Sequence, residues 1–331
     1  MNASCQVRVE SVRKVFADGR HNAFTDLCRF RDKIYLTFRS CPDGHMVFPS
    51  SSITVLASTD ARQWEQVCAF SVPTRDVRDP HLLVFGDTLF VYTGTWLCKD
   101  NPAALDMNEH LGYGASTRDG VTWDGPQLLE GTYGHYVWRA AAFGGKAYLC
   151  GRRKRGFPHT PGLSEGAETT ESALLESDDG LVWKFRGLFQ ETFGDETAFL
   201  FEADGAILAV ARSLKSGPAQ VCRARPPYSA WTRTDLDRGV GGPLLAKWGT
   251  RYLVGGRKTL DPKTPRTTLY WLVEDQLQEI AELPSGGDNS YPGLLALDAN
   301  RALVSYYSSH EGSRSGQPPA AIYLAEISLS E

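Results

Sequence analysis

The sequence has 331 residues and a formal net charge of −4, with 42% hydrophobic and 11% aromatic residues. The weak negative charge excludes the basic surface with which proteins bind nucleic acid, and no apolar stretch reaches the roughly 18 residues that an ordinary membrane helix needs. The 32 glycines and the many aromatic residues favour short strands joined by tight turns.

The N-terminal segment, MNASCQVRVESVRKVF, alternates polar and apolar residues as a β-strand does. It lacks the apolar core of a secretory signal. We therefore expect a cytoplasmic protein, or a periplasmic or secreted one if a signal was removed.

A phrase made of a large apolar residue, a turn and an apolar run then recurs six times. Its copies are FRDKIYLTFR, FGDTLFVYTG, FGGKAYLCGR, EADGAILAVAR, KWGTRYLVGGR and LDANRALVSYY. Aligned at Tyr35, Phe90, Tyr148, Leu208, Tyr252 and Leu303, the copies lie 55, 58, 60, 44 and 51 residues apart. Each copy predicts a β-hairpin.

A second phrase follows the first three hairpins, and it ends in tryptophan each time: STDARQW (58–64), STRDGVTW (116–123) and ESDDGLVW (176–183). Asp and Gly followed by an aromatic residue are typical of a turn whose ring packs into a core. Each unit therefore has four predicted strands, A to D. The last unit lacks its strand D, and the N-terminal strand has no unit of its own.

This pattern predicts a single all-β domain over residues 1–331, a six-bladed β-propeller whose ring is closed by the N-terminal strand. The alternative is a stack of sandwich domains, for which a repeat of roughly 50 residues is too short.

In such a propeller, the loops that enter strand A and the loops from B to C open on one face. Several B strands end in arginine, and carboxylates lie in the same two sets of loops. These arginines are Arg39, Arg152, Arg212 and Arg257, and the acids are Asp43, Asp79, Glu196, Asp288 and Glu311. A ring of arginines is self-repulsive unless anions or carboxylates lie among them, so this face is expected to bind an anionic or hydroxyl-rich ligand.

Metal binding is not expected. The seven cysteines form no CxxC pair. His21, His45, His81 and His135 fall in loops of the predicted ligand face, but their spacing is not that of a compact metal motif. The sequence also offers no motif for a cofactor.

These residues together resemble the sialidase superfamily of six-bladed propellers. The Asp-Gly-Trp phrases are similar to its Asp-box, S-x-D-x-G-x-T-W. The segment from Glu196 to Arg212 resembles the sialidase segment that runs from a glutamate to a substrate-binding arginine, and SYPGLL resembles the segment of the tyrosine nucleophile. One departure is clear, because HNAFTDL replaces the F-R-I-P phrase and supplies no first-blade arginine. Phrases such as HNAFTDL, RDPH and SYYSSHEG are similar to a bacterial sialidase-like subgroup.

The resemblance implies an exo-acting glycoside hydrolase that removes a terminal sugar, expected to be acidic, from an oligosaccharide or glycoconjugate. Tyr291 would be the nucleophile and Glu196 its base, with Asp43 or His45 as the acid/base. The residues expected to bind substrate are Arg39, Arg78, Asp79, His81, Arg139, Arg212, Arg257, Asp288, Asn289 and His310.

Three alternatives stay open at this point. Asp79 and Glu196 could form an inverting carboxylate pair. Tyrosine with His45, His81 or His135 could instead serve a polysaccharide lyase. A propeller that only binds glycans would keep aromatic residues such as Trp96, Trp138 and Tyr291 but would not need the Tyr291–Glu196 pair.

Overall fold

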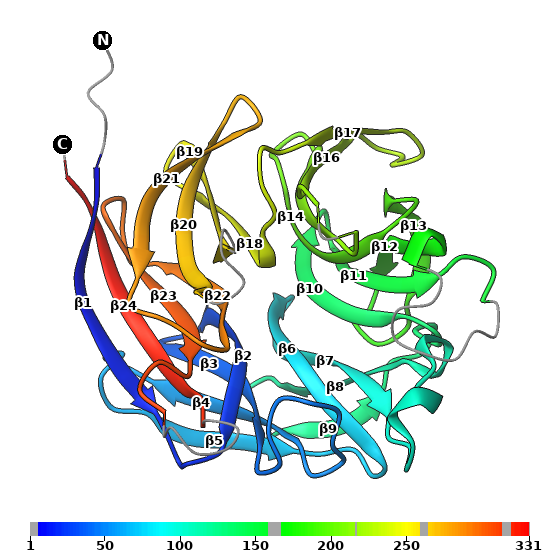
Figure 1. The fold of residues 1–331 in the computed structure, drawn as a ribbon, viewed down its shortest axis with the longest axis horizontal. Coiled ribbons are helices and arrows are strands. Elements are labelled where there is room, and N and C mark those ends of the chain that lie inside the picture. Colours follow the sequence, from blue (N-terminus) through cyan, green and yellow to red (C-terminus); the bar gives the residue numbers. More distant parts are fainter. Residues whose placement is uncertain (1–5, 158–166, 216, 259–263, 313–318, 331) are drawn as a thin grey trace.

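A computed structural model describes residues 6–157, 167–215, 217–258, 264–312 and 319–330. Six antiparallel sheets of four strands each are arranged in a ring (Figure 1). The inner strand of each blade contacts the inner strands of both neighbouring blades, so these six strands surround the central channel. The predicted six-bladed propeller is confirmed.

The blades are named by their order along the chain, and each strand pairs with the next within its blade. Blade 1 comprises β2 (His21–Phe30), β3 (Lys33–Cys41), β4 (Ser52–Ser58) and β5 (Glu65–Phe70). Blade 2 comprises β6 (Arg75–Phe85), β7 (Thr88–Leu97), β8 (Leu111–Thr117) and β9 (Asp124–Leu128). Blade 3 comprises β10 (Tyr136–Phe143), β11 (Lys146–Lys154), β12 (Thr170–Ser177) and β13 (Lys184–Gln190). Blade 4 comprises β14 (Gly194–Phe201), β15 (Ile207–Ser213), β16 (Gln220–Ala224) and β17 (Trp231–Asp235). Blade 5 comprises β18 (Gly241–Trp248), β19 (Arg251–Lys258), β20 (Arg266–Val273) and β21 (Gln276–Leu283). Blade 6 comprises β22 (Asn289–Ala296), β23 (Arg301–Ser308), β24 (Ala321–Ser330) and β1 (Gln6–Phe16). Three short 3₁₀ helices are η1 (Pro102–Ala104), η2 (Met107–Glu109) and η3 (Ala167–Thr169).

The ring closes where the two ends of the chain meet in blade 6, as the sequence predicted. β1 pairs antiparallel with β24 from Gln6 opposite Ser330 to Phe16 opposite Ile322, and it forms the outer edge of the blade. Figure 1 shows β1 and β24 side by side, with both termini at the same edge. Among the described residues, no helix is long and apolar enough to cross a membrane.

The hydrophobic core lies mainly between neighbouring blades. One cluster joins blades 1 and 2, a second joins blades 2 and 3, and a third joins blades 5 and 6. The Asp-Gly-Trp turns lie between the third and fourth strands of blades 1 to 3, at the end opposite the predicted ligand face. In each of these turns an aspartate accepts two backbone N–H bonds, as when Asp119 Oδ1 accepts from Val121 and Thr122 at 2.8 Å. These phrases therefore stabilise turns of the fold.

Every inner strand carries an irregularity at the same point. The register against the second strand shifts between Ala23 and Asp26, Arg78 and His81, Val137 and Ala140, Gly194 and Thr197, Gly241 and Leu244, and Ser290 and Gly293. Such β-bulges redirect side chains and are frequent beside active sites. The bulges place Phe24, Asp79, Glu196 and Tyr291 in the wall of one cavity at the channel mouth.

Four of these bulges also contain a residue in the left-handed backbone region. The φ angles are 62° at Phe24, 52° at Asp79, 58° at Gly242 and 51° at Tyr291. This conformation costs a residue with a Cβ roughly 1–2 kcal/mol. Three non-glycine residues bear that cost around one channel mouth, which is typical of a site selected for function.

The closing strand supplies the first testable prediction. Deleting residues 1–16 removes β1, uncovers the edge of β24 and exposes the apolar cluster against which Val7, Val9 and Val12 pack, including Ala325 and Ile327. Because each kcal/mol lost shifts the melting temperature of a large domain by roughly 2–4 °C, we expect a fall of more than about 10 °C or a loss of soluble monomer. Differential scanning calorimetry and size-exclusion chromatography measure both.

Deleting residues 1–5 is the matched control, because it leaves β1 intact. It is expected to keep the melting temperature within about 2 °C of the full chain, because every pair between β1 and β24 remains. Equal stability of the two truncated proteins would contradict the role of β1 in ring closure.

Candidate active site

A cavity of about 360 Å³ opens at the channel mouth, on the face that the sequence predicted. Strands and loops of blades 1, 2, 3, 4 and 6 contribute to its lining. The lining side chains that carry chemistry are Arg78, Asp79, Tyr136, Arg152, Glu196, Arg212 and Tyr291, and Phe24, His45 and Trp96 complete the wall.

Tyr291 and Glu196 form a hydrogen-bonded pair across this cavity. The Tyr291 hydroxyl donates to Glu196 Oε1 at 2.7 Å. Glu196 Oε2 accepts from Arg212 Nη1 at 3.0 Å and from the backbone N–H of Gly242 at 3.1 Å. Both oxygens of the glutamate are therefore occupied, one by the tyrosine and the other by groups that fix its orientation.

The electrostatics of the pair keep the proton on the phenol at rest. Burial raises the pKa of Glu196, but the charge of Arg212 and the hydrogen bond from Tyr291 outweigh it, so that this pKa lies below its ordinary value. Burial, and then the negative charge of Glu196, raise the pKa of Tyr291 well above its ordinary value. The pair consists of an ionised carboxylate and a neutral phenol, as a general base and its nucleophile require.

Gly242 supports the ring of Tyr291 from the neighbouring blade. A Cβ built at Gly242 would lie 2.6 Å from Cδ2 of Tyr291, well inside van der Waals contact. Only glycine leaves room for the tyrosine ring here while its own N–H bonds to Glu196. Gly242 therefore positions both members of the pair.

Asp79 is a second buried carboxyl group in the same cavity. Its Oδ2 accepts a hydrogen bond from the Tyr136 hydroxyl, and its Oδ1 is buried without a partner among the described residues. Burial, followed by the charge of Glu196, raises the pKa of Asp79 to about 6. Two carboxyl groups whose environments move their pKa values apart are suited to opposite roles as acid and base.

The arginines around the mouth are held by internal carboxylates. Arg152 Nη1 donates to Asp195 Oδ1 at 2.5 Å, and Arg212 Nε lies 3.2 Å from Asp195 Oδ2. Arg78 Nη1 donates to Asp76 Oδ2 at 3.2 Å. The guanidinium of Arg39 is fully buried and bonds to the other oxygen of Asp76 at 2.9 Å, so it does not reach the cavity.

Beside the cavity, the carboxylate of Asp288 accepts bonds from two histidines. His21 Nε2 and His45 Nδ1 lie 2.8 and 2.6 Å from the same oxygen, Oδ2. Asp288 Oδ1 accepts from the Tyr307 hydroxyl at 2.8 Å and from Arg257 Nη2 at 3.3 Å. We call these five residues the Asp288 cluster.

The Asp288 cluster contains the two-histidine, one-carboxylate set that transition metals often bind, with its three ligand atoms within 4.8 Å of one another. Both imidazoles, however, are bonded to a single carboxylate oxygen, and the Arg257 guanidinium lies on the other oxygen. A divalent ion here would be repelled by that cation. The geometry fits a hydrogen-bonded cluster better than a metal site.

Beneath the cavity, Arg139 and Asp26 form a buried ion pair at 2.9 Å in the channel. His81 Nδ1 lies 3.3 Å from the second oxygen of Asp26. Arg139 and His81 were both expected to bind substrate, but their positions make them part of the channel floor. Trp138, at the bulge of blade 3, packs against the rings of His81 and Tyr291 with centroids 5.0 and 6.3 Å away.

The remaining predicted residues lie outside the cavity. Asp43 is exposed and accepts a bond from Ser50 at 2.5 Å. The side chain of Asn289 is buried and bonds to Thr267, and His310 bonds to Ser308. Of the residues expected from the sequence, those that line the cavity are Arg78, Asp79, Glu196, Arg212, Tyr291 and His45.

Sequence reasoning did not select Tyr136, Asp195 or Gly242, and it placed Arg152 in the arginine ring without naming it among the substrate-binding residues. Arg152 lies opposite Tyr136, just before the bulge of blade 3, whereas Arg212 lies opposite the bulge of blade 4. For Gly242, the signal was its place in the fifth copy of the bulge that carries Tyr291 in the sixth.

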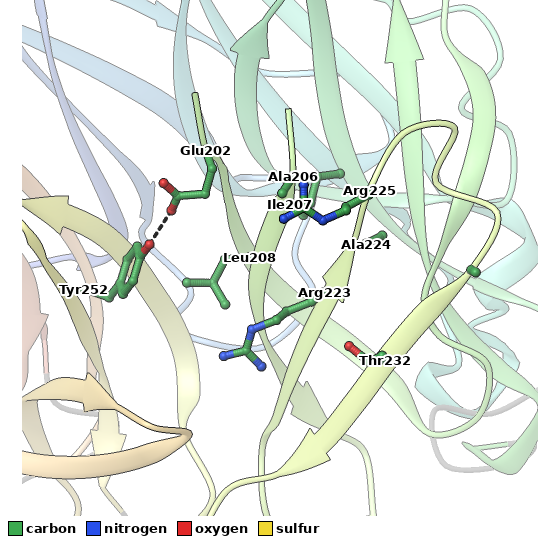
Figure 2. Close-up of a pocket in the computed structure, with 10 residues that line it drawn as sticks. Glu202, Ala206, Ile207, Leu208, Arg223, Ala224, Arg225, Thr232 and Tyr252 are labelled. Atoms are coloured by element: carbon green, nitrogen blue, oxygen red, sulfur yellow. Dashed lines mark hydrogen bonds between the residues drawn. The ribbon is translucent and has the colours of Figure 1, made fainter. Parts of the chain in front are cut away.

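A second cavity, of about 470 Å³, lies between blades 4 and 5 near the turn from β14 to β15, at the other end of the strands (Figure 2). It is larger, but its polar groups are paired with one another or with neighbours. Tyr252 donates to Glu202 Oε1 at 2.5 Å, and Arg223 bonds to Asp275. The wall between them is formed by Ile207 and Leu208, and Glu202 is the only acid among the described residues that line this cavity, whereas the channel-mouth cavity holds both Asp79 and Glu196. The channel-mouth cavity is therefore the better candidate for chemistry.

Comparison with known proteins gives no match to any family model or to any curated protein. Among solved structures, the chain is similar to a protein of unknown function from Dyadobacter fermentans DSM 18053, with a TM-score of 0.80 and 21% identity over 98% of this chain and 100% of that one. It is also similar to Trypanosoma rangeli sialidase in complex with the inhibitor DANA, with a TM-score of 0.66 and 13% identity over 96% of this chain and 58% of that one.

A third similar structure is the Hadza microbial sialidase Hz136, with a TM-score of 0.67 and 14% identity over 92% of this chain and 65% of that one. The fold is a six-bladed propeller like that of sialidases. This chain spans about three fifths of the length of the two sialidase chains. At these identities the likeness establishes the fold and leaves the activity to be argued from the site.

The contact between Gly242 and Tyr291 yields a prediction about stability. Gly242→Ala is expected to cost roughly 1–2 kcal/mol for the positive φ angle and a further 1–3 kcal/mol for the clash with the ring of Tyr291. Chemical denaturation measures the total.

Gly249→Ala is a matched control in the same blade, because Gly249 has a φ of 61° but no atom within 4 Å of its Cβ position. This variant should show the backbone cost alone. Equal losses for the two variants would mean that Gly242 does not constrain the tyrosine.

Proposed function

We propose that the protein is an exo-acting glycoside hydrolase that retains anomeric configuration and acts on an oligosaccharide or glycoconjugate. Tyr291 is the nucleophile, Glu196 is the base that activates it, and Asp79 is the acid/base. The observation that carries the proposal is the 2.7 Å hydrogen bond from Tyr291 to Glu196 inside a cavity that also holds Asp79.

In the first step, the Tyr291 oxygen attacks the anomeric carbon while its proton passes to Glu196. The bond from that carbon to the leaving oxygen breaks, and Asp79 donates a proton to this oxygen. In the second step, Asp79 takes a proton from water, which attacks the anomeric carbon, and Tyr291 leaves and regains its proton from Glu196. The net reaction is hydrolysis with two displacements, and hence retention.

Asp79 replaces Asp43 and His45 as the acid/base in this proposal. Asp43 is exposed outside the cavity, and the Nδ1 of His45 is bonded to Asp288. Asp79 combines a place in the cavity, an Oδ1 without a partner among the described residues and a raised pKa, which suit an acid that must be protonated near neutral pH.

The contacts of Glu196 disfavour the inverting alternative. An inverting enzyme needs a carboxylate that faces a water molecule in the space between two acids. Both oxygens of Glu196 are occupied by Tyr291, Arg212 and Gly242. The similarity in fold to Trypanosoma rangeli sialidase, whose structures include complexes with sialic acid and with the inhibitor DANA, supports glycoside hydrolysis as the reaction class.

The decisive experiment is a panel of α- and β-linked aryl glycosides, including sialosides and uronides, assayed with the wild type and two variants. Tyr291→Phe and Glu196→Gln are each expected to lower kcat by at least about 100-fold, because each removes one half of the nucleophile pair. Proton NMR of the product that forms first reports retention or inversion.

Tyr252→Phe and Glu202→Gln are matched controls, since these residues form a second Tyr–Glu hydrogen bond in the cavity at the other end of the blades (Figure 2). Their turnover should stay at the wild-type value. Wild-type turnover in both Tyr291→Phe and Glu196→Gln, or no release from any glycoside, would contradict the proposal.

The two carboxyl groups also predict the pH dependence. Asp79 must be protonated to act as acid, and its pKa is about 6, so kcat/KM should fall as the pH rises through about 6. Glu196 must be ionised, and its pKa lies below the ordinary value, so the acid limb should lie below pH 4.5. A pH–rate profile whose alkaline limb lies above about pH 8 would rule out Asp79 as the acid.

Stability provides an independent readout of the same group. The pKa of Asp79 is higher in the folded state than in the unfolded chain, so the folded state binds more protons between about pH 4 and 6. The contribution of Asp79 to stability is therefore present at low pH and is lost as the pH rises through 6. Asp79→Asn should remove this loss, which urea denaturation at pH 4.5 and 7 measures.

A further inference from the structure

The charges around the cavity are balanced within the protein itself. Five arginines surround the channel mouth, and each has a carboxylate partner. The pairs are Arg39 and Arg78 with Asp76, Arg152 and Arg212 with Asp195, Arg212 with Glu196, and Arg257 with Asp288. The ring of arginines that the sequence displayed is thus largely neutralised before any ligand binds.

The protein binds the carboxylate of Asp288 in the way that proteins bind the carboxylate of a ligand. Four side chains converge on Asp288 from separate parts of the chain: His21 and His45 on Oδ2, and Tyr307 and Arg257 on Oδ1. Charge-assisted bonds from arginine, histidine and tyrosine are the usual means by which a protein binds the carboxylate of a ligand. Here the carboxylate belongs to the protein.

The Asp288 cluster is adjacent to the reacting groups. His45 lines the cavity and bonds to Asp288. The Arg257 guanidinium lies 5.7 Å from the ring centroid of Tyr291, and the Tyr307 ring lies 6.0 Å from it. The side chains of Asp288 and Arg257 are 27% and 25% exposed, so both are open to solvent beside the cavity that His45 and Tyr291 line.

Asp288 is ionised under all ordinary conditions. Burial raises its pKa, but the hydrogen bonds from His21 and His45 outweigh burial and bring the pKa well below its ordinary value. A second carboxylate brought to this wall would meet the negative charge of Asp288 and would find the Arg257 guanidinium already engaged with Asp288, Tyr307 and the backbone oxygen of Asn289.

We infer that Asp288 is a specificity-determining residue. Its carboxylate is an internal anion that occupies the site formed by His21, His45, Arg257 and Tyr307. The side of the sugar that faces this wall therefore carries hydroxyl groups, and a carboxylate on that side is rejected. The inference rests on the proposed function for the identity of the ligand as a sugar. It differs from the acidic sugar that the arginine ring of the sequence suggested, because the structure pairs Arg257 with a carboxylate of its own. Rejection by a charge already in place is an established route to specificity.

Removing the carboxylate should convert this wall into an anion site. Asp288→Ala frees four donors and one positive charge, so its affinity for D-glucuronate is expected to rise at least about 10-fold over the wild type at low ionic strength. Its affinity for D-glucose should change by less than about 3-fold, because the sugar ring keeps its other contacts. Ligand-observed NMR titrations measure both, with acetate as a third probe that carries a carboxylate alone.

Three further variants sharpen the test. Asp288→Asn removes the charge and keeps nearly the same shape, so its affinity for D-glucuronate should also rise. It serves as the test variant if Asp288→Ala is poorly folded. Asp43→Ala removes one negative charge from an exposed position on the same face, and it should leave both affinities unchanged. The double variant Asp288→Ala with Arg257→Gln should lose the gain for glucuronate and acetate, because the freed cation is gone.

The experiment needs no turnover, so its failure is distinct from failure of the proposed hydrolase reaction. The inference is overturned if folded Asp288→Ala and Asp288→Asn gain no affinity for either carboxylate, or if the gain survives Arg257→Gln. It is also overturned if both single variants fail to fold, since Asp288 would then be a structural group.

Discussion

A buried ion pair between Arg139 and Asp26 holds the floor of the channel together. Arg139 lies on the inner strand of blade 3, and its guanidinium reaches Asp26 of blade 1 at 2.9 Å and the carbonyl oxygens of Pro292 and Pro243, in blades 6 and 5, at 2.6 and 3.3 Å. Asp26 in turn accepts the backbone N–H of Leu82 in blade 2 at 3.0 Å. Burying two charges is costly, and such a pair is tolerated only where hydrogen bonds satisfy both members. Five blades supply those bonds.

The same contacts fix the geometry of the candidate site above the floor. Pro292 and Pro243 directly follow Tyr291 and Gly242, so Arg139 holds the backbone just after each of these bulged residues. The strained φ angles of Asp79 and Tyr291 persist because the surrounding strands determine them. The propeller thus supplies a repeated bulge, and the blades differ in the side chain that the bulge presents. The proposed acid, base and nucleophile come from three copies of one backbone feature.

Sequence patterns predicted the fold almost completely and the site only in part. The recurring hairpin and the missing strand of the last unit predicted six blades and their closure by β1, because both follow from hydrophobic periodicity and chain order. Tyr291 and Glu196 were selected by resemblance, and the structure brings them together. The sequence offered Asp79 as a substrate-binding residue or as one carboxyl group of an inverting pair, but its raised pKa could not be predicted, because it depends on burial beside Glu196, which is distant in sequence. Arg39 looked exposed at the end of a strand, but the segment after β3 folds over it and supplies the carbonyl oxygens of Gly44 and Met46.

The pairing of β1 with β24 also sets the order in which the molecule can be completed. During synthesis β1 emerges first, yet its only partner strand within the described residues emerges last, so the first strand waits unpaired while five blades form. Closing a contact between such distant segments is entropically costly and slow. Because Tyr291 belongs to that final blade, it joins Glu196 only when the ring is nearly finished. A nascent or truncated chain would therefore display the arginines and Asp79 without the tyrosine, and the complete constellation would exist only in the closed ring.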